Sequence, residues 1–195
     1  MSDVAVIMRS RNSDWVIHQA LASLAAQRFR DYELVVVVAG STDRTLAMVQ
    51  AHRHRLITIS GERYQPGPVL TAAIAETGAA RLVFWHSDAV AMHDRVLEQL
   101  VGALDGADAA FVRQLPRPEA HGWVRRDYAA SFPASGEPPP WITLSLVCSA
   151  MRRPELAIRT LSRAARSAIR ALPGRAVLPM MSRKRAWGHC RLCKD

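Results

Sequence analysis

The chain has 195 residues, which is enough for one well-packed domain and short for two. Apolar residues make up 49% of it and charged residues 22%, a balance that excludes a disordered chain. Its apolar runs are too short to cross a bilayer, which takes about 20 residues. No signal peptide follows Met1, and three cysteines do not make a disulfide framework. These features predict a cytoplasmic protein.

The formal net charge of +9 is typical of a nucleic-acid binder until it is located along the chain. Residues 151–195 contain 12 of the 26 basic residues and only two of the 17 acidic ones. Residues 1–150 therefore hold 14 basic and 15 acidic residues and are close to neutral. We expect a domain over residues 1–150, a basic tail over residues 151–195 and no nucleic-acid partner.

Short apolar runs alternate with amphipathic stretches as far as Leu104. The runs predict buried strands at residues 4–8, 34–38, 56–59 and 82–85. A helix is expected after each strand: one capped by Asn12 or Ser13, one opening at residues 41–43 and ending near Arg53, one from Pro68 to the cap Gly78, and one striped by apolar residues at 96–104. This alternation predicts an α/β fold with a mainly parallel sheet flanked by helices.

Residues 116–140 break the alternation. The segment is rich in proline, it carries the aromatic residues Trp123, Tyr128 and Phe132, and Trp141 directly follows it. We expect a long loop over the sheet, and loops of this length within compact domains are usually functional.

Ligands of such sheets bind at the carboxyl ends of the strands, where the candidate residues lie. The sequence lacks Gly-x-Gly-x-x-Gly, Walker A and Gly-x-Ser-x-Gly motifs, which argues against dinucleotide oxidoreductases, P-loop enzymes and serine hydrolases. Asp88 directly follows the fourth strand, and a carboxylate there can hold a divalent metal against a diphosphate. A lone aspartate is more often a turn cap, and a histidine such as His86 at a strand end is more often a half-buried ring than a ligand.

Four segments, in this order, resemble family 2 glycosyltransferases of the GT-A fold. They are residues 4–12 (VAVIMRSRN), 33–45 (ELVVVVAGSTDRT), 84–89 (FWHSDA) with 94–97 (DRVL), and 110–118 (AFVRQLPRP). The third lies where the family keeps its Asp-x-Asp metal motif, and the fourth is similar to the rhamnosyltransferase-like branch. The resemblance covers residues 3–153 and implies the Rossmann-like GT-A fold.

The resemblance also implies an inverting transfer of a sugar from a nucleotide-diphosphate donor to the hydroxyl of a glycan or lipid-linked acceptor, in cell-surface polysaccharide or glycolipid synthesis. A divalent metal, Mg²⁺ or Mn²⁺, would neutralise the leaving diphosphate while a carboxylate base takes the acceptor proton. By position the metal ligand is Asp88. The implied nucleotide-sugar site comprises Met8, Arg9, Ser10, His86, Ser87, Asp88, Arg113 and Gln114.

The chain departs from the family pattern at several positions. Val38 stands where an aspartate usually binds the nucleotide, His86 replaces the first aspartate of the metal motif, and Thr71 stands where an asparagine is common. No catalytic base is identified, because Glu155 is the only acid between Arg153 and Asp195. The alternative function is therefore a non-catalytic pseudoenzyme, a GT-A-like module that binds a nucleotide or a partner, with a basic tail for acidic surfaces.

The tail admits three interpretations. Residues 155–172 place apolar residues on one helical face and arginines on the other, which suits peripheral contact with the anionic inner face of a membrane. The same pattern is typical of a solvated helix packed on the domain. The third interpretation is that the tail is out-of-frame sequence on a truncated transferase, since acidic residues disappear where the family has them.

Overall fold

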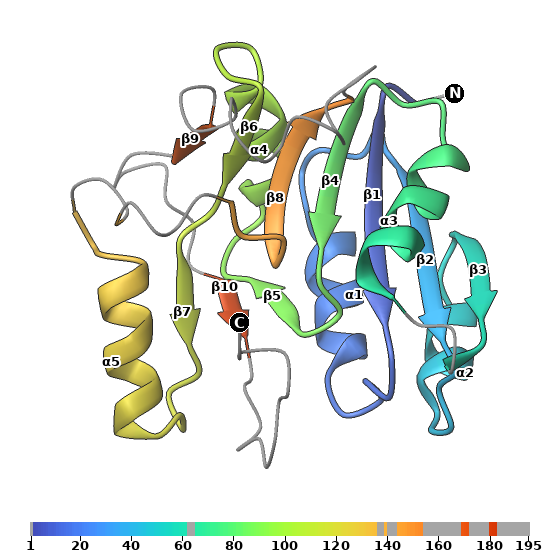
Figure 1. Cartoon of the computed structure of the whole chain (residues 1–195), viewed down its shortest axis with the longest axis horizontal. Helices are drawn as coiled ribbons and strands as arrows, with labels where there is room; N and C mark the ends of the chain where they lie inside the picture. The colour runs from blue at the N-terminus through green and yellow to red at the C-terminus, as the bar shows by residue number, and fades with distance from the viewer. Residues whose placement is uncertain are drawn as a thin grey trace.

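The computed structural model describes residues 2–61, 65–135, 139, 144–153, 169–171 and 180–182. The first half of the chain alternates strand and helix (Figure 1). Its elements are β1 (Val4–Ser10), α1 (Ile17–Ala25), β2 (Glu33–Ala39), α2 (Thr45–Gln50), β3 (Arg55–Ile59), α3 (Pro66–Ala75), β4 (Arg81–Trp85), β5 (Ala89–Ala91) and α4 (Val96–Ala103). The later elements are β6 (Ala109–Phe111), β7 (Gln114–Pro116), α5 (Gly122–Ser131), β8 (Cys148–Arg152), β9 (Ile169–Ala171) and β10 (Met180–Ser182).

Within the described residues, the main sheet has seven strands in the order β3-β2-β1-β4-β8-β6-β9. Strands β3, β2, β1 and β4 are mutually parallel, whereas β8 runs antiparallel to both β4 and β6. A small second sheet has the order β5-β10-β7. The prediction of a mainly parallel α/β sheet is confirmed, and each of the four predicted strands lies within an observed one.

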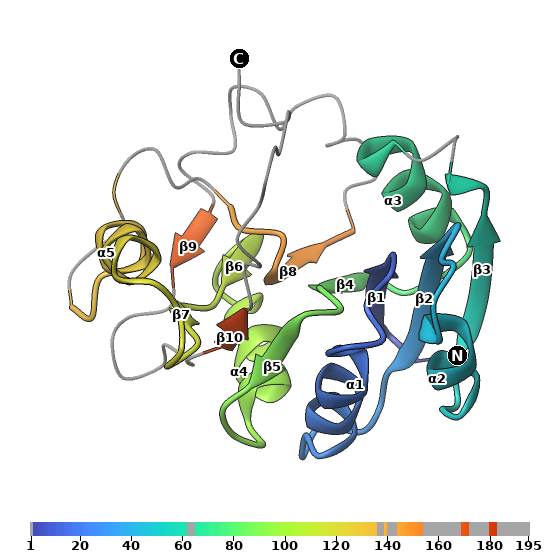
Figure 2. The same cartoon turned by 90° about the horizontal axis from the view of Figure 1, so that it is seen from below.

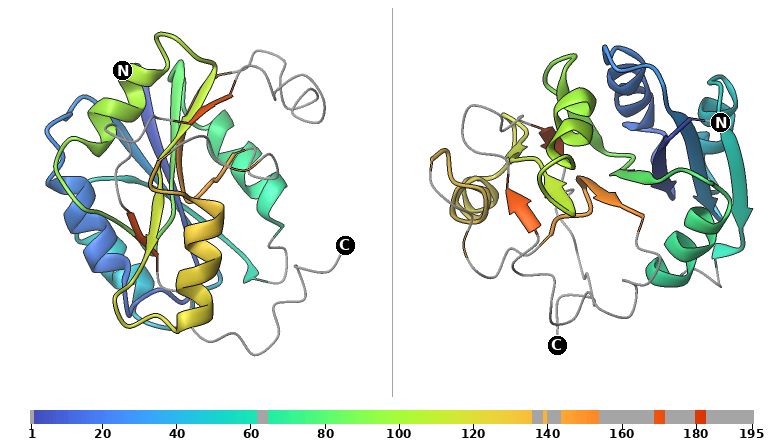
Figure 3. Two further views of the ribbon diagram at one scale, coloured as in Figure 1. Left: turned by 90° about the vertical axis from the view of Figure 1, so that its left-hand side faces the viewer. Right: turned by 90° about the horizontal axis from the view of Figure 1, so that it is seen from above.

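Strand alternation sends successive β1 side chains to opposite layers of helices. Val4, Val6 and Met8 pack in one buried cluster with residues of α1 and α4. Ala5 and Ile7 pack in a second cluster with residues of α3. Viewed along the sheet, α1 and α4 cover one face and α3 covers the other (Figures 2 and 3). Because both faces of the central strands are covered, β1 and β2 are almost purely apolar.

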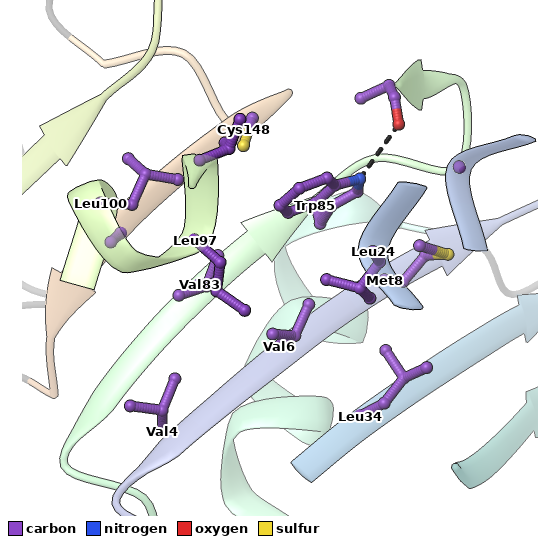
Figure 4. Close-up of a cluster of buried hydrophobic side chains, with 14 of the residues drawn as sticks. Val4, Val6, Met8, Leu24, Leu34, Val83, Trp85, Leu97, Leu100 and Cys148 are labelled. Carbon is purple, nitrogen blue, oxygen red and sulfur yellow. Dashed lines mark hydrogen bonds between the residues drawn. The ribbon is translucent and has the colours of Figure 1, made fainter. Parts of the chain in front are cut away.

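The larger cluster centres on Trp85, the bulkiest fully buried side chain (Figure 4). Its indole Nε1 donates a hydrogen bond to the Ala89 carbonyl oxygen at 3.0 Å, which satisfies the one polar atom of the ring. The predicted apolar stripe of α4 is confirmed by the burial of Val96, Leu97, Leu100, Val101 and Leu104. Trp85 therefore anchors the start of the loop after β4 in the core.

Gln27 joins α1 to the start of α4. Its side chain is buried, and its amide Nε2 donates to the carbonyl oxygens of Ser23 and His93 at 3.0 and 2.9 Å. Its Oε1 accepts a hydrogen bond from the N–H of Leu97 at 2.9 Å. This N–H lies in the first turn of α4, where it has no partner within the helix. One buried amide thus fixes the position of α4 against α1.

Several local predictions are wrong. Neither Asn12 nor Ser13 caps α1 with its side chain; instead the Ser13 carbonyl oxygen accepts from the N–H groups of Val16 and Ile17. Helix α3 ends at Ala75, before Gly78. The segment 116–140 is not all loop, since it contains the end of β7 and all of α5. Only Val124 and Tyr128 of α5 are buried, so the helical pattern is weak in the sequence.

The predicted tail helix falls mostly on residues 155–168, which lie outside the described residues. Ile169–Ala171, at its predicted end, is a strand that pairs in parallel with β6. Among the described helices, none combines the length and the apolar character needed to span a membrane.

Candidate functional site

The loops that follow β1 and β2 are tied together at the carboxyl edge of the sheet. Asn12 adopts a positive φ of 48°, a conformation that asparagine tolerates better than most residues. In this conformation its Oδ1 accepts from the N–H of Thr42 at 2.9 Å, and its own N–H donates to Ser41 Oγ at 3.1 Å. The Ser41 hydroxyl therefore serves the neighbouring loop and does not cap α2.

Asp43 strengthens the same connection. Its Oδ1 accepts from the N–H of Thr45 at 3.0 Å, as expected for a residue that opens α2, and its Oδ2 accepts from the N–H of Asp14 at 3.1 Å. Partial burial is the largest single influence on the pKa of Asp43, and it raises that pKa. The hydrogen bonds from Thr45 and Asp14 lower the pKa, and their combined effect is larger than that of burial. The pKa of Asp43 therefore lies below its ordinary value. The ionised carboxylate is thus a structural part of the edge.

A third link reaches the loop after β4. The hydroxyl groups of Ser13 and Ser87 lie 3.1 Å apart and both residues are buried. The N–H of Ser13 also donates to Thr45 Oγ1 at 2.7 Å. These bonds hold the loops after β1, β2 and β4 at one edge, where ligands of parallel α/β sheets bind.

The loop after β3 meets the loop after β2 at Gly40. Gly40 has a φ of +54°, and its N–H donates to the Ile59 carbonyl oxygen at 2.9 Å. A β-carbon on Gly40 would lie 2.4 Å from the backbone nitrogen of Gly61, a separation that atoms do not tolerate. Glycine is therefore required at this close approach.

The turn after β4 contains the residues that resemble a metal motif. His86 Nδ1 lies 2.5 Å from Asp88 Oδ1, and the two side chains are 32% and 20% exposed. The main chain holds this turn: the N–H of His86 donates to the Val147 carbonyl oxygen at 2.8 Å, and the N–H of Ala89 donates to the His86 carbonyl oxygen at 3.0 Å. The pair is accessible, and a carboxylate with an imidazole is a donor set that fits a divalent cation.

A pocket opens between the ends of β1 and β4. Its lining residues are Ile7, Arg9, Leu70, Phe84, Trp85, His86 and Leu146. The apolar walls come from β1, β4, α3 and the segment before β8, and the polar groups at the pocket are those of Arg9 and His86. This pocket lies at the carboxyl ends of β1 and β4, where ligands of parallel α/β sheets bind.

The remaining residues of the predicted site are not among the residues that line this pocket. Met8 and Ser10 point to the face of β1 opposite Arg9: Met8 is fully buried in the core, and the buried Ser10 Oγ has no hydrogen-bond partner within the described residues. Ser87 is the residue bonded to Ser13. The structure therefore brings Arg9 and His86 together at the pocket, with Asp88 held by His86.

Arg113 and Gln114 approach neighbouring segments of the protein. Arg113 Nε donates to the Phe132 carbonyl oxygen at 3.0 Å, at the end of α5. Gln114 is buried, and its amide nitrogen donates to the hydroxyl of Ser145. Arg113 therefore connects the start of β7 to the end of α5, and Gln114 connects β7 to the segment that includes Leu146.

Sequence reasoning missed Leu70 and Leu146 as pocket residues. Leu70 is one of several apolar residues in α3 and carries no motif, and Leu146 lies far along the chain. Leu70 and Leu146 reach the pocket because α3 and the segment before β8 pack on the ends of β1 and β4, and the sequence does not show this packing.

No curated protein matches this sequence. Among solved structures, the fold is similar to S. aureus TarS 1–349, with a TM-score of 0.68 and 21% identity over 93% of this chain and 60% of that one. It is also similar to mannosyltransferase PcManGT from Pyrobaculum calidifontis, with a TM-score of 0.64 and 19% identity over 91% of this chain and 56% of that one. For glucosyl-3-phosphoglycerate synthase from Mycobacterium tuberculosis, the TM-score is 0.64 and the identity 23%, over 94% of this chain and 72% of that one.

These similarities concern the fold, which is GT-A-like, and this chain spans about 60% of the TarS structure. The sequence itself matches the family model described as glycosyl transferase family 2 over residues 5–154. That match covers the four parallel strands, the pocket and the His86–Asp88 turn. The chain therefore belongs to glycosyl transferase family 2.

Proposed function

We propose that this chain binds a nucleotide-diphosphate sugar and transfers the sugar, with inversion, to a hydroxyl of a glycan or lipid-linked acceptor in cell-surface polysaccharide or glycolipid synthesis. The observation that carries the proposal is the pocket between β1 and β4, with Arg9 and His86 at its polar side and Asp88 bonded to His86. Structural neighbours support it, since TarS was solved with UDP-GlcNAc and PcManGT with GDP-Man and Mn²⁺.

Each part of the site has a role that follows from its chemistry. Arg9, which lines the pocket, carries a guanidinium group whose positive charge favours an anionic ligand. The turn that carries His86 and Asp88 would hold a divalent cation, Mg²⁺ or Mn²⁺, whose charge stabilises a leaving diphosphate. Ser87 holds the turn in place through Ser13. We place the donor-binding domain at residues 1–150 and leave the catalytic base unassigned.

A thermal-shift titration with UDP, GDP and dTDP, each with and without Mn²⁺, tests donor binding. A ligand at about 100 times its dissociation constant should stabilise the native state by about 2.7 kcal/mol. We expect a metal-dependent shift with at least one nucleotide, lost in Asp88→Ala. Asp105→Ala is the matched control, because Asp105 is an exposed aspartate beyond the end of α4. The absence of a shift with every nucleotide would overturn the proposal.

A specific observation favours a second candidate, a pseudoenzyme that binds a nucleotide or a partner without transferring sugar. Val38 and Ala39 end β2 as buried apolar residues, so β2 presents no carboxylate to a nucleotide at this edge. Assay of the bound nucleotide's UDP-, GDP- or dTDP-sugar separates the two functions. Metal-dependent hydrolysis or transfer supports the enzyme, whereas tight binding without turnover supports the pseudoenzyme.

We propose that the basic tail makes peripheral contact with a membrane surface, where a lipid-linked acceptor would lie. Residues 151–195 carry 12 basic and two acidic residues, a charge that favours the anionic inner face of a membrane. Co-sedimentation of the full chain with anionic and zwitterionic vesicles tests this. We expect binding to anionic vesicles only, weakened by salt, and equal recovery with both kinds of vesicle would contradict it.

A further inference from the structure

The His86–Asp88 pair has a defined orientation. A carboxylate accepts hydrogen bonds, so His86 Nδ1 carries the proton of the 2.5 Å contact with Asp88 Oδ1. The other ring nitrogen, Nε2, makes no hydrogen bond within the described part of the chain. A histidine whose one nitrogen is bound to a carboxylate while the other remains available is the arrangement found around metal-bound histidines.

The surroundings of the ring agree with this role. His86 lines the pocket beside Arg9, and its main chain is fixed by hydrogen bonds with Val147 and Ala89. Within the described residues, no group of three or more His, Cys, Asp or Glu side chains surrounds a cation site. Diphosphate oxygens and water are common ligands of cations that bridge a protein and phosphates, and they can complete the coordination here.

We infer that His86 Nε2 is the nitrogen ligand of the donor-site cation, and that Asp88 is the carboxylate that orients the ring. The inference rests on the proposed function and specifies the metal class of that same site. Imidazole binds Co²⁺ and Zn²⁺ well, whereas Mg²⁺ strongly prefers oxygen ligands. The site should therefore select nitrogen-tolerant cations over Mg²⁺, with affinity rising from Mn²⁺ to Co²⁺.

Pulsed electron paramagnetic resonance of Mn²⁺ bound to the full chain with UDP, GDP or dTDP tests the ligand directly. We expect hyperfine coupling to an imidazole nitrogen, lost in His86→Asp and retained in His18→Asp, a control at an exposed residue of α1. Competition by Mg²⁺ and Co²⁺ tests selectivity. His86→Asp should reduce the preference for Co²⁺ over Mg²⁺ by about tenfold or more.

Asp88→Asn is a second variant that retains an oxygen for the His86 N–H to donate to. It should weaken Mn²⁺ binding by about tenfold while the nitrogen coupling remains. If a nucleotide diphosphate binds with Mn²⁺ but no nitrogen coupling appears in the wild-type chain, the inference is overturned and the proposed function stands. An unchanged metal preference in His86→Asp also overturns it. If no nucleotide diphosphate binds with any cation, the proposed function fails and the inference fails with it.

Discussion

The Oγ atoms of Ser13 and Ser87 lie 3.1 Å apart, although 74 residues separate them in the chain. The contact places the loop after β1 against the turn that carries His86 and Asp88. Ser13 is also bonded through its N–H to Thr45 in α2. The position of the proposed metal turn therefore depends on two other loops of the sheet edge.

A double-mutant cycle measures this link. We expect Ser13→Ala and Ser87→Ala each to lower the free energy of unfolding by about 1 kcal/mol, because each removes the buried hydrogen bond between the two hydroxyl groups. Ser87→Ala should cost the less of the two, since Ser13 Oγ still donates to the Arg11 carbonyl oxygen at 3.2 Å. The double variant should cost less than the sum of the single ones, with a coupling energy of about 0.5–1.5 kcal/mol. Denaturant unfolding followed by tryptophan fluorescence gives the values, and additive effects would show that the two hydroxyls do not interact.

The sheet could be predicted from the sequence because its central strands are buried on both faces. The valines of β2 and the apolar run of β1 are continuous apolar segments, the pattern typical of strands that are covered on both faces of a sheet. Helix α5 was missed because only Val124 and Tyr128 are buried and prolines flank it. The local composition predicts a loop, and the helix is stabilised by its contacts with β7, which the sequence pattern does not reveal.

The site could be predicted in part. Its place at the carboxyl ends of β1 and β4 follows from the α/β topology, and Asp88 follows from its position after β4. The orientation of Met8, Arg9 and Ser10 was available in principle, because alternation along a strand sends Arg9 to one face and its neighbours to the other. The His86–Asp88 contact and the Ser13–Ser87 link depend on the exact path of the turn, which no sequence pattern records.

Gln27 should be the most sensitive polar residue of the α1–α4 interface. Gln27→Met keeps the volume but leaves the N–H of Leu97 and the carbonyl oxygen of His93 buried without this partner. We expect a loss of about 2–3 kcal/mol in the free energy of unfolding. Gln50→Met is the control, since Gln50 is exposed at the end of α2. Similar small losses for both variants would contradict the role of Gln27.

Asp43 should make the stability of the fold depend on pH. Its pKa is lower in the folded than in the unfolded chain, so its contribution is present above the unfolded pKa and is lost as the pH falls through the folded pKa. Asp43→Asn should therefore destabilise the protein at neutral pH and much less in acid. Asp31→Asn, at an exposed aspartate, is the control. A difference between wild type and Asp43→Asn that stays constant with pH would refute this.

Cys148 should be inert in the native state. It is fully buried in β8, and burial raises the pKa of its thiol well above the ordinary value, so little thiolate forms. In the Cys190→Ser/Cys193→Ser variant, a thiol reagent such as DTNB should react with Cys148 only after denaturant is added. Fast reaction of the folded variant would mean that the sheet opens readily around β8.

Gly40 and Gly102 should respond in opposite ways to alanine. Gly40 has a φ of +54°, and an added β-carbon would lie 2.4 Å from the backbone nitrogen of Gly61, so Gly40→Ala should cost at least about 1–2 kcal/mol. Gly102 lies within α4 with no atom near an added β-carbon, so Gly102→Ala should stabilise the fold by about 0.5–1 kcal/mol. Denaturant unfolding of both variants measures the difference.

Because the backbones of the loops after β2 and β3 meet at Gly40, Gly40→Ala should also weaken nucleotide binding, whereas Gly102→Ala should leave it unchanged. If Gly40→Ala kept full stability, the close approach of these two loops would not exist in solution.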